Sequence, residues 1–370
     1  MKLHILGLPH TVTSEEYSHC AFTGKIKRFS PMMKSVGYEV FHYGVEGADS
    51  GASSNIEVMS RSEQESYIGK HDPSSPEFIG RFADRGTPLY LEFNRRLSLE
   101  LQKNVEKHDV ICLPFGPGHK DALNEKLSHA FWIESGIGYN NPFLSFRVYE
   151  SFSHLHKIAG QDSEITKKSE GSNYNWVVPN YYDINEWKIS TKPGKYVLYL
   201  GRLGSFKGLD TVVEIAKATP DLPFVLAGQG DPTPFLKSPN IKYVGPVHGK
   251  TRSKLFENAI VTLCPSKYYE PFCGVAVESM LCGTPVLSVA FGAFTETIDQ
   301  GRTGFRCRTL GDWLEGLRRI RSWGKEERQY TASYARKKYD MYNLAFEYDK
   351  VFTQLHDLGG KGWFSKDFYI

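Results

Sequence analysis

The sequence predicts an α/β protein built from two doubly wound parallel-sheet domains that face a cleft. Short apolar runs alternate with helical stretches along the whole chain. These runs carry few polar residues, which is typical of parallel strands covered by helices on both faces. A polar stretch that contains Pro193 and Gly194 separates two halves of similar length, and its composition is that of a linker.

Nine strands are expected, and in chain order they are Leu3–Leu8, Glu39–Tyr43, Asp109–Pro114, Ala130–Ile133, Tyr196–Leu200, Phe224–Ala227, Lys242–Val244, Ala259–Leu263 and Pro285–Val289. In the second half, Asp210 is expected to cap a helix that ends near Ala218. Another helix is expected from Gly274 to Cys282, with Gly283 in the left-handed position that ends it.

These elements predict an N-terminal domain over residues 1–180, a linker over 181–194 and a C-terminal domain over 195–345. The aromatic-rich segment 346–370 is expected to pack back onto the N-terminal domain.

Composition excludes several classes of protein. With 40% hydrophobic residues the chain can bury real cores, which excludes a disordered or collagen-like protein. Its 45 basic and 42 acidic residues give a net charge of +3, so composition does not indicate a nucleic-acid coat. The six cysteines form no C-x-x-C pair, which favours reduced thiols in a cytoplasmic protein. No signal peptide and no membrane span of ~18 apolar residues are expected.

The first motif is the loop Gly201–Gly208 after the strand Tyr196–Leu200. It carries Arg202 and Lys207, five residues apart, at the carboxyl end of a strand, where open α/β sheets bind ligands. Glycine allows a close approach of the backbone, and the two cations can neutralise a diphosphate. The competing interpretation is a solvated turn with two surface cations.

The second motif is Ala227-Gly228-Gln229-Gly230-Asp231, a tight turn after the strand Phe224–Ala227. Alone it is weak. A fourth segment, from Phe291 to Phe305, supplies a further glycine-containing loop at the same sheet edge.

The third and strongest motif runs from Glu270 to Val286 and holds Glu270 and Glu278. Eight residues place these acids about 80° apart around a helix, so they can reach different parts of one elongated ligand. The amides of Cys273, Gly274 and Val275 open the helix, where unpaired N–H groups make a ready phosphate site. The competing interpretation is a capped amphipathic helix with two exposed glutamates.

Taken together, the four segments resemble the donor-binding domain of family-4 retaining glycosyltransferases, which have the GT-B fold and an E-x7-E motif. The resemblance covers about residues 199–305 and implies a nucleoside-diphosphate sugar as donor, no metal and no other cofactor. Arg202 and Lys207 are then expected to bind the diphosphate. Glu270 is expected to orient the donor sugar and Glu278 to bind the ribose.

The resemblance implies further donor contacts, which are expected at Gly7, Gly201, Gly228, Gly230, Val244, Val247, Cys273, Gly274 and Val275. The chain departs from the family pattern where Cys273 replaces the glycine of E-P-F-G. In the first domain, Glu134 stands where relatives often carry a histidine, with Ser135 beside it. His119 is the alternative.

Other interpretations of several segments and of the function remain. Gly245–Thr251 is one residue shorter than a P-loop, which disfavours an NTPase. The basic segment 316–340 is a solvated helix face or a contact for anionic lipid or nucleic acid. The acceptor is a glycan, lipid, protein, small molecule or modified DNA base. A catalytically silent nucleotide-sugar or glycan binding protein and a nucleotide-sugar epimerase are the alternatives to the transferase.

Overall fold

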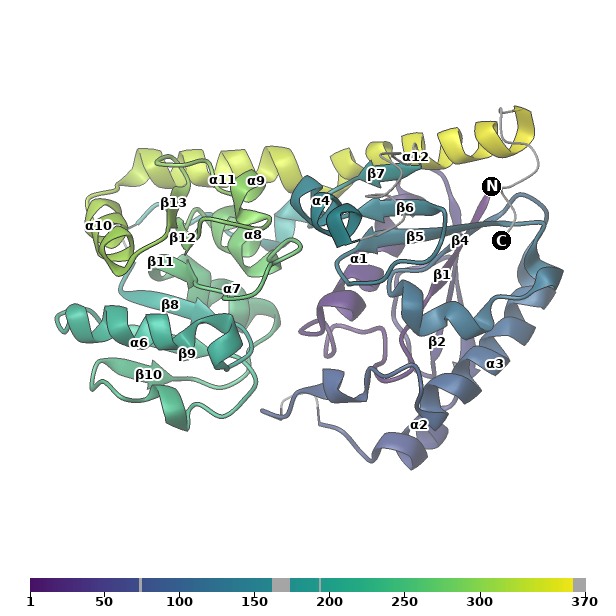
Figure 1. The fold of residues 1–370 in the computed structure, drawn as a ribbon, viewed down its shortest axis with the longest axis horizontal. Helices are drawn as coiled ribbons and strands as arrows, with labels where there is room; N and C mark the ends of the chain where they lie inside the picture. Colours follow the sequence, from purple (N-terminus) through teal and green to yellow (C-terminus); the bar gives the residue numbers. More distant parts are fainter. Residues whose placement is uncertain (73–74, 162–173, 193, 362–370) are drawn as a thin grey trace.

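Residues 1–72, 75–161, 174–192 and 194–361 are described by the computed structural model (Figure 1). Over these ranges the chain forms two parallel sheets with helices packed against them. The predicted α/β fold with two doubly wound sheets is therefore confirmed.

The first sheet has seven strands in the order β3-β2-β1-β4-β5-β6-β7 within the described ranges. They are β1 (Lys2–Leu6), β2 (Glu39–Val45), β3 (Ser54–Met59), β4 (Val110–Cys112), β5 (Phe131–Ile137), β6 (Phe146–Tyr149) and β7 (Asn175–Val177). The helices of this half are α1 (Ala21–Lys34), α2 (Arg61–Ile68), α3 (Pro88–Asn104) and α4 (Phe152–Gln161).

The second sheet has six strands in the order β10-β9-β8-β11-β12-β13, again within the described residues. They are β8 (Tyr196–Leu200), β9 (Phe224–Ala227), β10 (Ile241–Tyr243), β11 (Ala259–Cys264), β12 (Val286–Val289) and β13 (Gly304–Cys307). Its helices are α6 (Leu209–Ala218), α7 (Gly249–Glu257), α8 (Gly274–Leu281), α9 (Phe294–Thr297), α10 (Leu310–Ile320) and α11 (Lys325–Tyr339). Short 3-10 turns are η1 (Ile79–Phe82), η2 (Gly116–Ala122), η3 (Glu125–Leu127), η4 (Ile184–Glu186), η5 (Ser205–Lys207) and η6 (Thr233–Phe235).

All nine expected strands are found. β8 and β9 have the predicted bounds, and the ends of the others shift by at most four residues. Four strands escaped prediction, namely β3, β6, β7 and β13. They are short or carry polar residues: β3 reads Ser-Asn-Ile-Glu-Val-Met, and only its last two residues are buried. Such strands lack the continuous apolar run by which the others were recognised.

The cap predicted for α6 is wrong. Its N-cap is Gly208, in the left-handed conformation with φ 76°, and Asp210 lies in the first turn instead. A Cβ atom on Gly208 would lie 1.9 Å from the carbonyl oxygen of Pro265, so only glycine fits there. The predicted helix from Gly274 and the left-handed Gly283 (φ 79°) are confirmed.

The last helix, α12 (Met341–Lys361), packs against the first domain (Figure 1). Its apolar residues share one buried core with strands β1, β4 and β5, and they include Leu344, Tyr348, Val351, Phe352 and Leu355. Residues 362–370, the end of the segment expected to pack back, lie outside the described residues. No helix among the described residues is long and apolar enough to cross a membrane.

The chain passes between the two domains twice, once through the linker and once at the junction of α11 with α12. The amide of Tyr182 donates to the carbonyl of Tyr339, and the amide of Met341 donates to the carbonyl of Tyr182, both at 2.9 Å. The linker and the junction of α11 with α12 are therefore hydrogen-bonded to each other.

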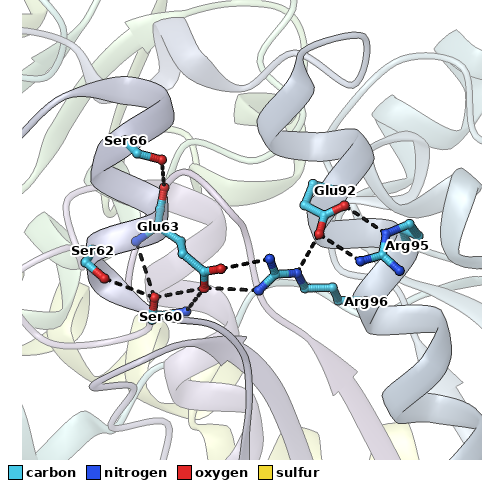
Figure 2. Close-up of polar contacts among 7 residues, drawn as sticks. All are labelled: Ser60, Ser62, Glu63, Ser66, Glu92, Arg95 and Arg96. Carbon is cyan, nitrogen blue, oxygen red and sulfur yellow. Dashed lines mark hydrogen bonds and ion pairs between the residues drawn. The ribbon is translucent and has the colours of Figure 1, made fainter.

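Ion pairs fix α2 to α3 on the outer side of the first domain (Figure 2). Ser60 and Glu63 form a capping box at the start of α2. Arg96 of α3 donates to both carboxylate oxygens of Glu63, at 2.8 and 3.0 Å, and to Glu92 at 2.6 Å. These bonds hold the pKa of Glu63 at about 2. The first turn of α2 is thus fixed to α3.

All six cysteines are free thiols, and all six lie in the described residues, so the expectation of no disulfide framework is confirmed.

Candidate functional site

Lys207 and Glu270 form a buried ion pair at the carboxyl edge of the second sheet. Lys207 lies in η5, after β8, and Glu270 lies in the loop after β11, the strand beside β8. The Lys207 Nζ atom is 2.7 Å from Oε1 of Glu270, whose residue is 4% exposed. Crossover connections bring the two loops together although 63 residues separate them.

Two hydroxyl groups complete the surroundings of Glu270. Ser266 donates to its Oε1 atom, and Tyr268 donates to its Oε2 atom, both at 2.5 Å. Lys207 also donates to the hydroxyl of Tyr268, at 2.7 Å. Burial and the charge of Glu270 raise the pKa of Tyr268 far above its usual range. The carboxylate is thus fixed by three donors, which orient it in a largely dry site.

Sequence reasoning missed Ser266 and Tyr268. The signal was available, because hydroxyl residues in Ser266-Lys267-Tyr268-Tyr269-Glu270 follow directly after a buried strand. Polar side chains at that end of a parallel strand face the ligand-binding edge.

Arg202 lies between two aromatic rings. Its guanidinium is 4.4 Å from the ring centre of Phe78 and 5.1 Å from that of Phe206. Tyr199 donates to the carbonyl of Arg202, at 2.7 Å, which fixes the backbone. Within the described part of the chain, the guanidinium N–H groups donate to no oxygen. Contact with the rings takes up none of the guanidinium N–H donors, so these donors stay available for an anion.

Glu278 of α8 is paired with Arg252 of α7. The Arg252 Nε atom donates to Oε2 of Glu278, at 2.7 Å, and a second guanidinium nitrogen contacts the same oxygen. Glu278 is 7% exposed. Sequence reasoning missed Arg252, which lies just beyond Gly245–Thr251, a segment considered as a possible P-loop and, at Val247, as a donor contact.

The start of α8 has an unusual backbone. Cys273, the N-cap, adopts the left-handed conformation with φ 69° and ψ 76°. This conformation explains why the family pattern has glycine at this position: an L-residue with a side chain is strained there. Cys273 also contacts Cys264, and hydrogen bonding between them together with burial raises the pKa of the Cys264 thiol.

Gly274 packs closely against the linker. A Cβ atom there would lie 2.6 Å from the hydroxyl of Tyr182 and 3.7 Å from Oε1 of Glu278. Among the described residues, the amides of Cys273, Gly274 and Val275 make no hydrogen bond. The predicted donors at the start of α8 are therefore available to a ligand.

The glycines of the first two motifs serve the packing of one loop against the other. The amide of Gly201 donates to the carbonyl of Ala227, and the amide of Leu203 donates to that of Gln229. A Cβ atom on Gly228 would lie 1.8 Å from the carbonyl oxygen of Gly201. One on Gly230 would lie 2.8 Å from the carbonyl oxygen of Leu203.

The amides of Gly228 and Gly230 already donate to protein carbonyls, those of Gly245 and Pro76, both at 2.9 Å. Gly7 is packed in the same way. Its amide donates to the carbonyl of Tyr43, and a Cβ atom would lie 2.7 Å from that oxygen. Donor contacts at these glycines stay a prediction.

Val244 and Val247 follow β10. Val244 is exposed, with its amide bonded to the carbonyl of Leu226, and Val247 is half-buried against the core near Phe256. A role beside a nucleobase stays a prediction for both.

In the first domain, Glu134 is fully buried in β5. Its carboxylate accepts from the hydroxyl of Tyr139 and from the amides of Phe143 and Leu144. Burial raises the pKa of Glu134. Ser135 is buried beside it, and its amide donates to the carbonyl of Leu113. Glu134 therefore orders its own loop, and a donor or acceptor contact stays a prediction.

His119 lies in the core. It is fully buried, contacts the amide oxygen of Asn94 at 3.3 Å, and has its pKa lowered to about 3 by burial. His119 is therefore a core residue rather than a solvated loop histidine, and a donor or acceptor contact there stays a prediction.

The domains meet through loops at the carboxyl ends of both sheets. Ser151, after β6, donates to the carbonyl of Pro271, at 2.6 Å. The amides of Phe152 and Ser153 at the start of α4 donate to the carboxylate of Glu296, at 3.0 and 2.6 Å. These contacts lie next to Glu270, so the first domain borders the candidate site.

Several cations of the basic segment 316–340 bind the protein itself. Arg328 is buried and donates to the carbonyls of Ser190 and Ala259 and to Thr284 Oγ1. Arg336 donates to the carbonyl of Trp187, and Lys338 to that of Glu296. These three cations are bonded to the linker and the C-terminal domain, so they favour neither a lipid nor a nucleic-acid contact.

Residues 183–338 match the family model described as glycosyl transferases group 1. An uncharacterized glycosyltransferase of Methanocaldococcus jannaschii is 30% identical over 219 residues, covering 51% of this chain and 55% of the relative. A glycogen synthase of Mycobacterium tuberculosis is 27% identical over 198 residues, covering 48% and 47%. The chain thus spans about half the length of these relatives.

Solved structures extend the likeness to both domains. HepE of Anabaena, in complex with UDP and glucose, superposes with a TM-score of 0.68 over 95% of this chain and 99% of that one, at 14% identity. Sucrose-phosphate synthase from Thermosynechococcus elongatus gives 0.67 over 96% and 99%, at 14% identity. AviGT4, a glycosyltransferase involved in avilamycin A biosynthesis, gives 0.66 over 96% and 98%, at 17% identity.

The fold is that of the GT-B glycosyltransferases, and residues 183–338 are similar to the family described as glycosyl transferases group 1.

Proposed function

We propose that this chain is a retaining glycosyltransferase that moves a sugar from a nucleoside-diphosphate sugar to an acceptor hydroxyl. The observation that carries the proposal is the guanidinium of Arg202, which contacts two rings and donates to no oxygen of the described residues, beside the Lys207–Glu270 pair. The bond from the anomeric carbon to the diphosphate breaks, and a bond to the acceptor oxygen forms on the same face. The acceptor proton passes to the departing phosphate oxygen, which lies next to the incoming hydroxyl.

Positive charge and fixed donors stabilise the leaving group. Arg202 offers its in-plane N–H groups and Lys207 its ammonium to the diphosphate, while the amides of Cys273–Val275 donate to a phosphate or sugar oxygen. Preorganised donors of this kind stabilise charge as it develops in the transition state. Lys207 then moves part of its interaction from Glu270 to the phosphate as negative charge grows there.

The two acids hold the rest of the donor. Glu270, oriented by Ser266 and Tyr268, accepts from hydroxyls of the sugar and so aligns the anomeric carbon. Glu278 accepts from the ribose hydroxyls, and its bond to Arg252 fixes the carboxylate for this task.

UDP-sugars are the first donors to test, because HepE of Anabaena, which shares the fold, is described in complex with UDP-glucose. The acceptor class stays open among glycans, lipids, proteins, small molecules and modified DNA bases. Residues 1–180 together with 346–370 are proposed as the acceptor unit, and residues 195–345 as the donor unit. A peripheral contact with anionic lipid or nucleic acid is proposed for the cations of residues 316–340 other than Arg328, Arg336 and Lys338.

We also propose that transfer needs no metal, because Arg202 and Lys207 supply two positive charges where the diphosphate departs. Turnover that is unchanged in EDTA supports this point, and turnover restored only by added Mg²⁺ or Mn²⁺ contradicts it.

The decisive experiment is a thermal-shift screen of UDP-, GDP- and ADP-sugars, followed by product analysis with and without an acceptor array. Slow hydrolysis or transfer with retained anomeric configuration supports the transferase. Binding without turnover on any acceptor supports a silent binding protein. An altered sugar without an acceptor supports an epimerase, and an inverted product refutes retention.

A further inference from the structure

A short segment of the first domain is bound by the loops of the second. We call Ser75–Phe78, between α2 and η1, the docking segment. The side-chain nitrogen of Gln229 donates to the carbonyls of Ser75 and Glu77, at 3.1 and 2.9 Å. The amide of Gly230 donates to the carbonyl of Pro76, at 2.9 Å. Gln229 is 7% exposed, and the side-chain nitrogen directs both of its hydrogen bonds to this segment.

The docking segment ends with Phe78, whose ring stacks on Arg202. The guanidinium lies 4.4 Å from Phe78, which belongs to the first domain, and 5.1 Å from Phe206, which belongs to the second. Each domain therefore supplies one aromatic ring to the guanidinium. Contact with two rings restricts the rotation of the side chain, and among the described residues its N–H groups donate to no oxygen.

The docking segment is itself held in place. It begins seven residues after the end of α2, whose first turn carries the Glu63–Arg96 ion pairs to α3 (Figure 2). Glu77 forms an exposed ion pair with Arg81 at 2.9 Å, and Ile79, the residue after the segment, is buried in the core of the first domain. The ring of Phe78 is thus carried by a braced part of the first domain.

We infer that Phe78 and Gln229 are positioning residues for the phosphate-binding Arg202, so that the donor site is complete only when the first domain docks on the second. The inference rests on the proposed function and goes beyond it, because it makes turnover depend on a residue outside the donor domain. Gln229 holds the segment, and Phe78 transmits its position to the guanidinium.

Removing the ring of Phe78 should lower kcat less than removing the guanidinium of Arg202. A cation–π contact of this kind corresponds to about 3- to 30-fold in rate if its whole effect falls on the transition state. Phe78→Ala should therefore lower kcat by that factor, whereas Arg202→Ala should lower it by about 10²–10³. Phe78→Tyr keeps the ring and should keep most of the rate.

The test is a double-mutant cycle on hydrolysis of the nucleotide sugar that the thermal-shift screen selects. If Phe78 acts through Arg202, adding Phe78→Ala to Arg202→Ala lowers kcat by less than twofold further. Phe78 is 40% exposed, so its truncation spares the core. Phe346→Ala, on α12 and 59% exposed, is the matched control and should keep the wild-type rate.

A second readout follows docking without any substrate. Hydrogen exchange at the Gly230 amide reports its bond to Pro76. Gln229→Glu places a carboxylate against two carbonyl oxygens, so it should speed this exchange at least tenfold and lower kcat as Phe78→Ala does. Exchange should stay slow in the wild-type chain.

The outcomes separate the two claims. A wild-type chain that turns over no nucleotide sugar refutes the proposed function. An active wild-type chain whose rate survives Phe78→Ala, or a double variant whose losses multiply, refutes the positioning role alone. Gly230 exchange that is fast in the wild type or unchanged in Gln229→Glu refutes docking.

Discussion

The ammonium of Lys207 lies 2.7 Å from a carboxylate oxygen of Glu270, and the two residues come from loops that follow the adjacent parallel strands β8 and β11. This pair occupies the position where open α/β sheets bind their ligands. It links the cation expected at a diphosphate to the acid expected at a sugar.

Lys207→Ala should lower turnover by about 10²–10³, because it removes one fixed charge from the leaving group and leaves Glu270 without its ion-pair partner. Steady-state hydrolysis of the nucleotide sugar measures this loss. The control is Lys267→Ala, because Lys267 pairs with Asp210 on the surface, where both side chains are 52% exposed. Such a pair contributes little, so its loss should leave the rate unchanged. Equal rates for both variants would remove Lys207 from the site.

Glu278→Gln should weaken donor binding by about 10- to 100-fold, because an amide replaces the charged acceptor of the ribose hydroxyls. Arg252→Met should weaken it in the same direction by releasing the carboxylate. Titration calorimetry with the nucleotide sugar measures both. Glu315→Gln, which breaks a similar pair with Arg318 on the exposed face of α10, is the control. An unchanged affinity in Glu278→Gln would rule out the ribose contact.

Cys273→Gly should raise the free energy of unfolding by about 0.5–1 kcal/mol, because glycine adopts the left-handed backbone at φ 69° without strain. The greater entropy of glycine in the unfolded chain offsets only part of this stabilisation. Urea denaturation measures the change. Cys273→Ala removes the same thiol but keeps a Cβ atom, so it should not stabilise the protein. Equal stabilisation by both variants would show that the thiol, rather than the backbone, causes the strain.

Acid should destabilise the protein below about pH 6.5. Burial lowers the pKa of His10 and His42 to about 4 and that of His119 to about 3, so the fold favours their neutral forms. Their contribution is complete above the unfolded pKa of about 6.5 and is lost as the pH falls toward 4. Each histidine adds a slope of up to about 1.4 kcal/mol per pH unit in that window.

Urea denaturation at pH 7.5, 6.5, 5.5 and 4.5 measures this slope. His119→Asn should reduce it, and His156→Asn, on the exposed face of α4, should leave it as it is. A free energy of unfolding that stays flat across this range would contradict the argument.

The sequence predicted the fold best where a local pattern of residues has a single structural explanation. Buried parallel strands such as β8 and β11 need continuous apolar runs, so both were recognised. Gly283 was predicted from its position before Pro285. By contrast, β3 alternates polar and apolar residues, and α6 is capped by Gly208 because of a neighbouring carbonyl that no local pattern reveals.

Within the site, Lys207 and Glu270 were found from motifs, and their contact confirms that the two loops meet. Arg252 and Phe78 were not found, because their roles depend on partners 26 and 124 residues away along the chain. Glycines 228 and 230 show what the motif did not reveal. Their missing side chains make room for the backbone of the neighbouring loop, and the donor contacts expected there stay a prediction.

A crystal structure of the chain with UDP-glucose, or with the nucleotide sugar that binds best, tests the central claim most directly. The account predicts the diphosphate in contact with Arg202, Lys207 and the amides at the start of α8, with the ribose at Glu278 and the sugar at Glu270. A nucleotide sugar bound elsewhere, with these side chains still paired as they are without it, would contradict the account.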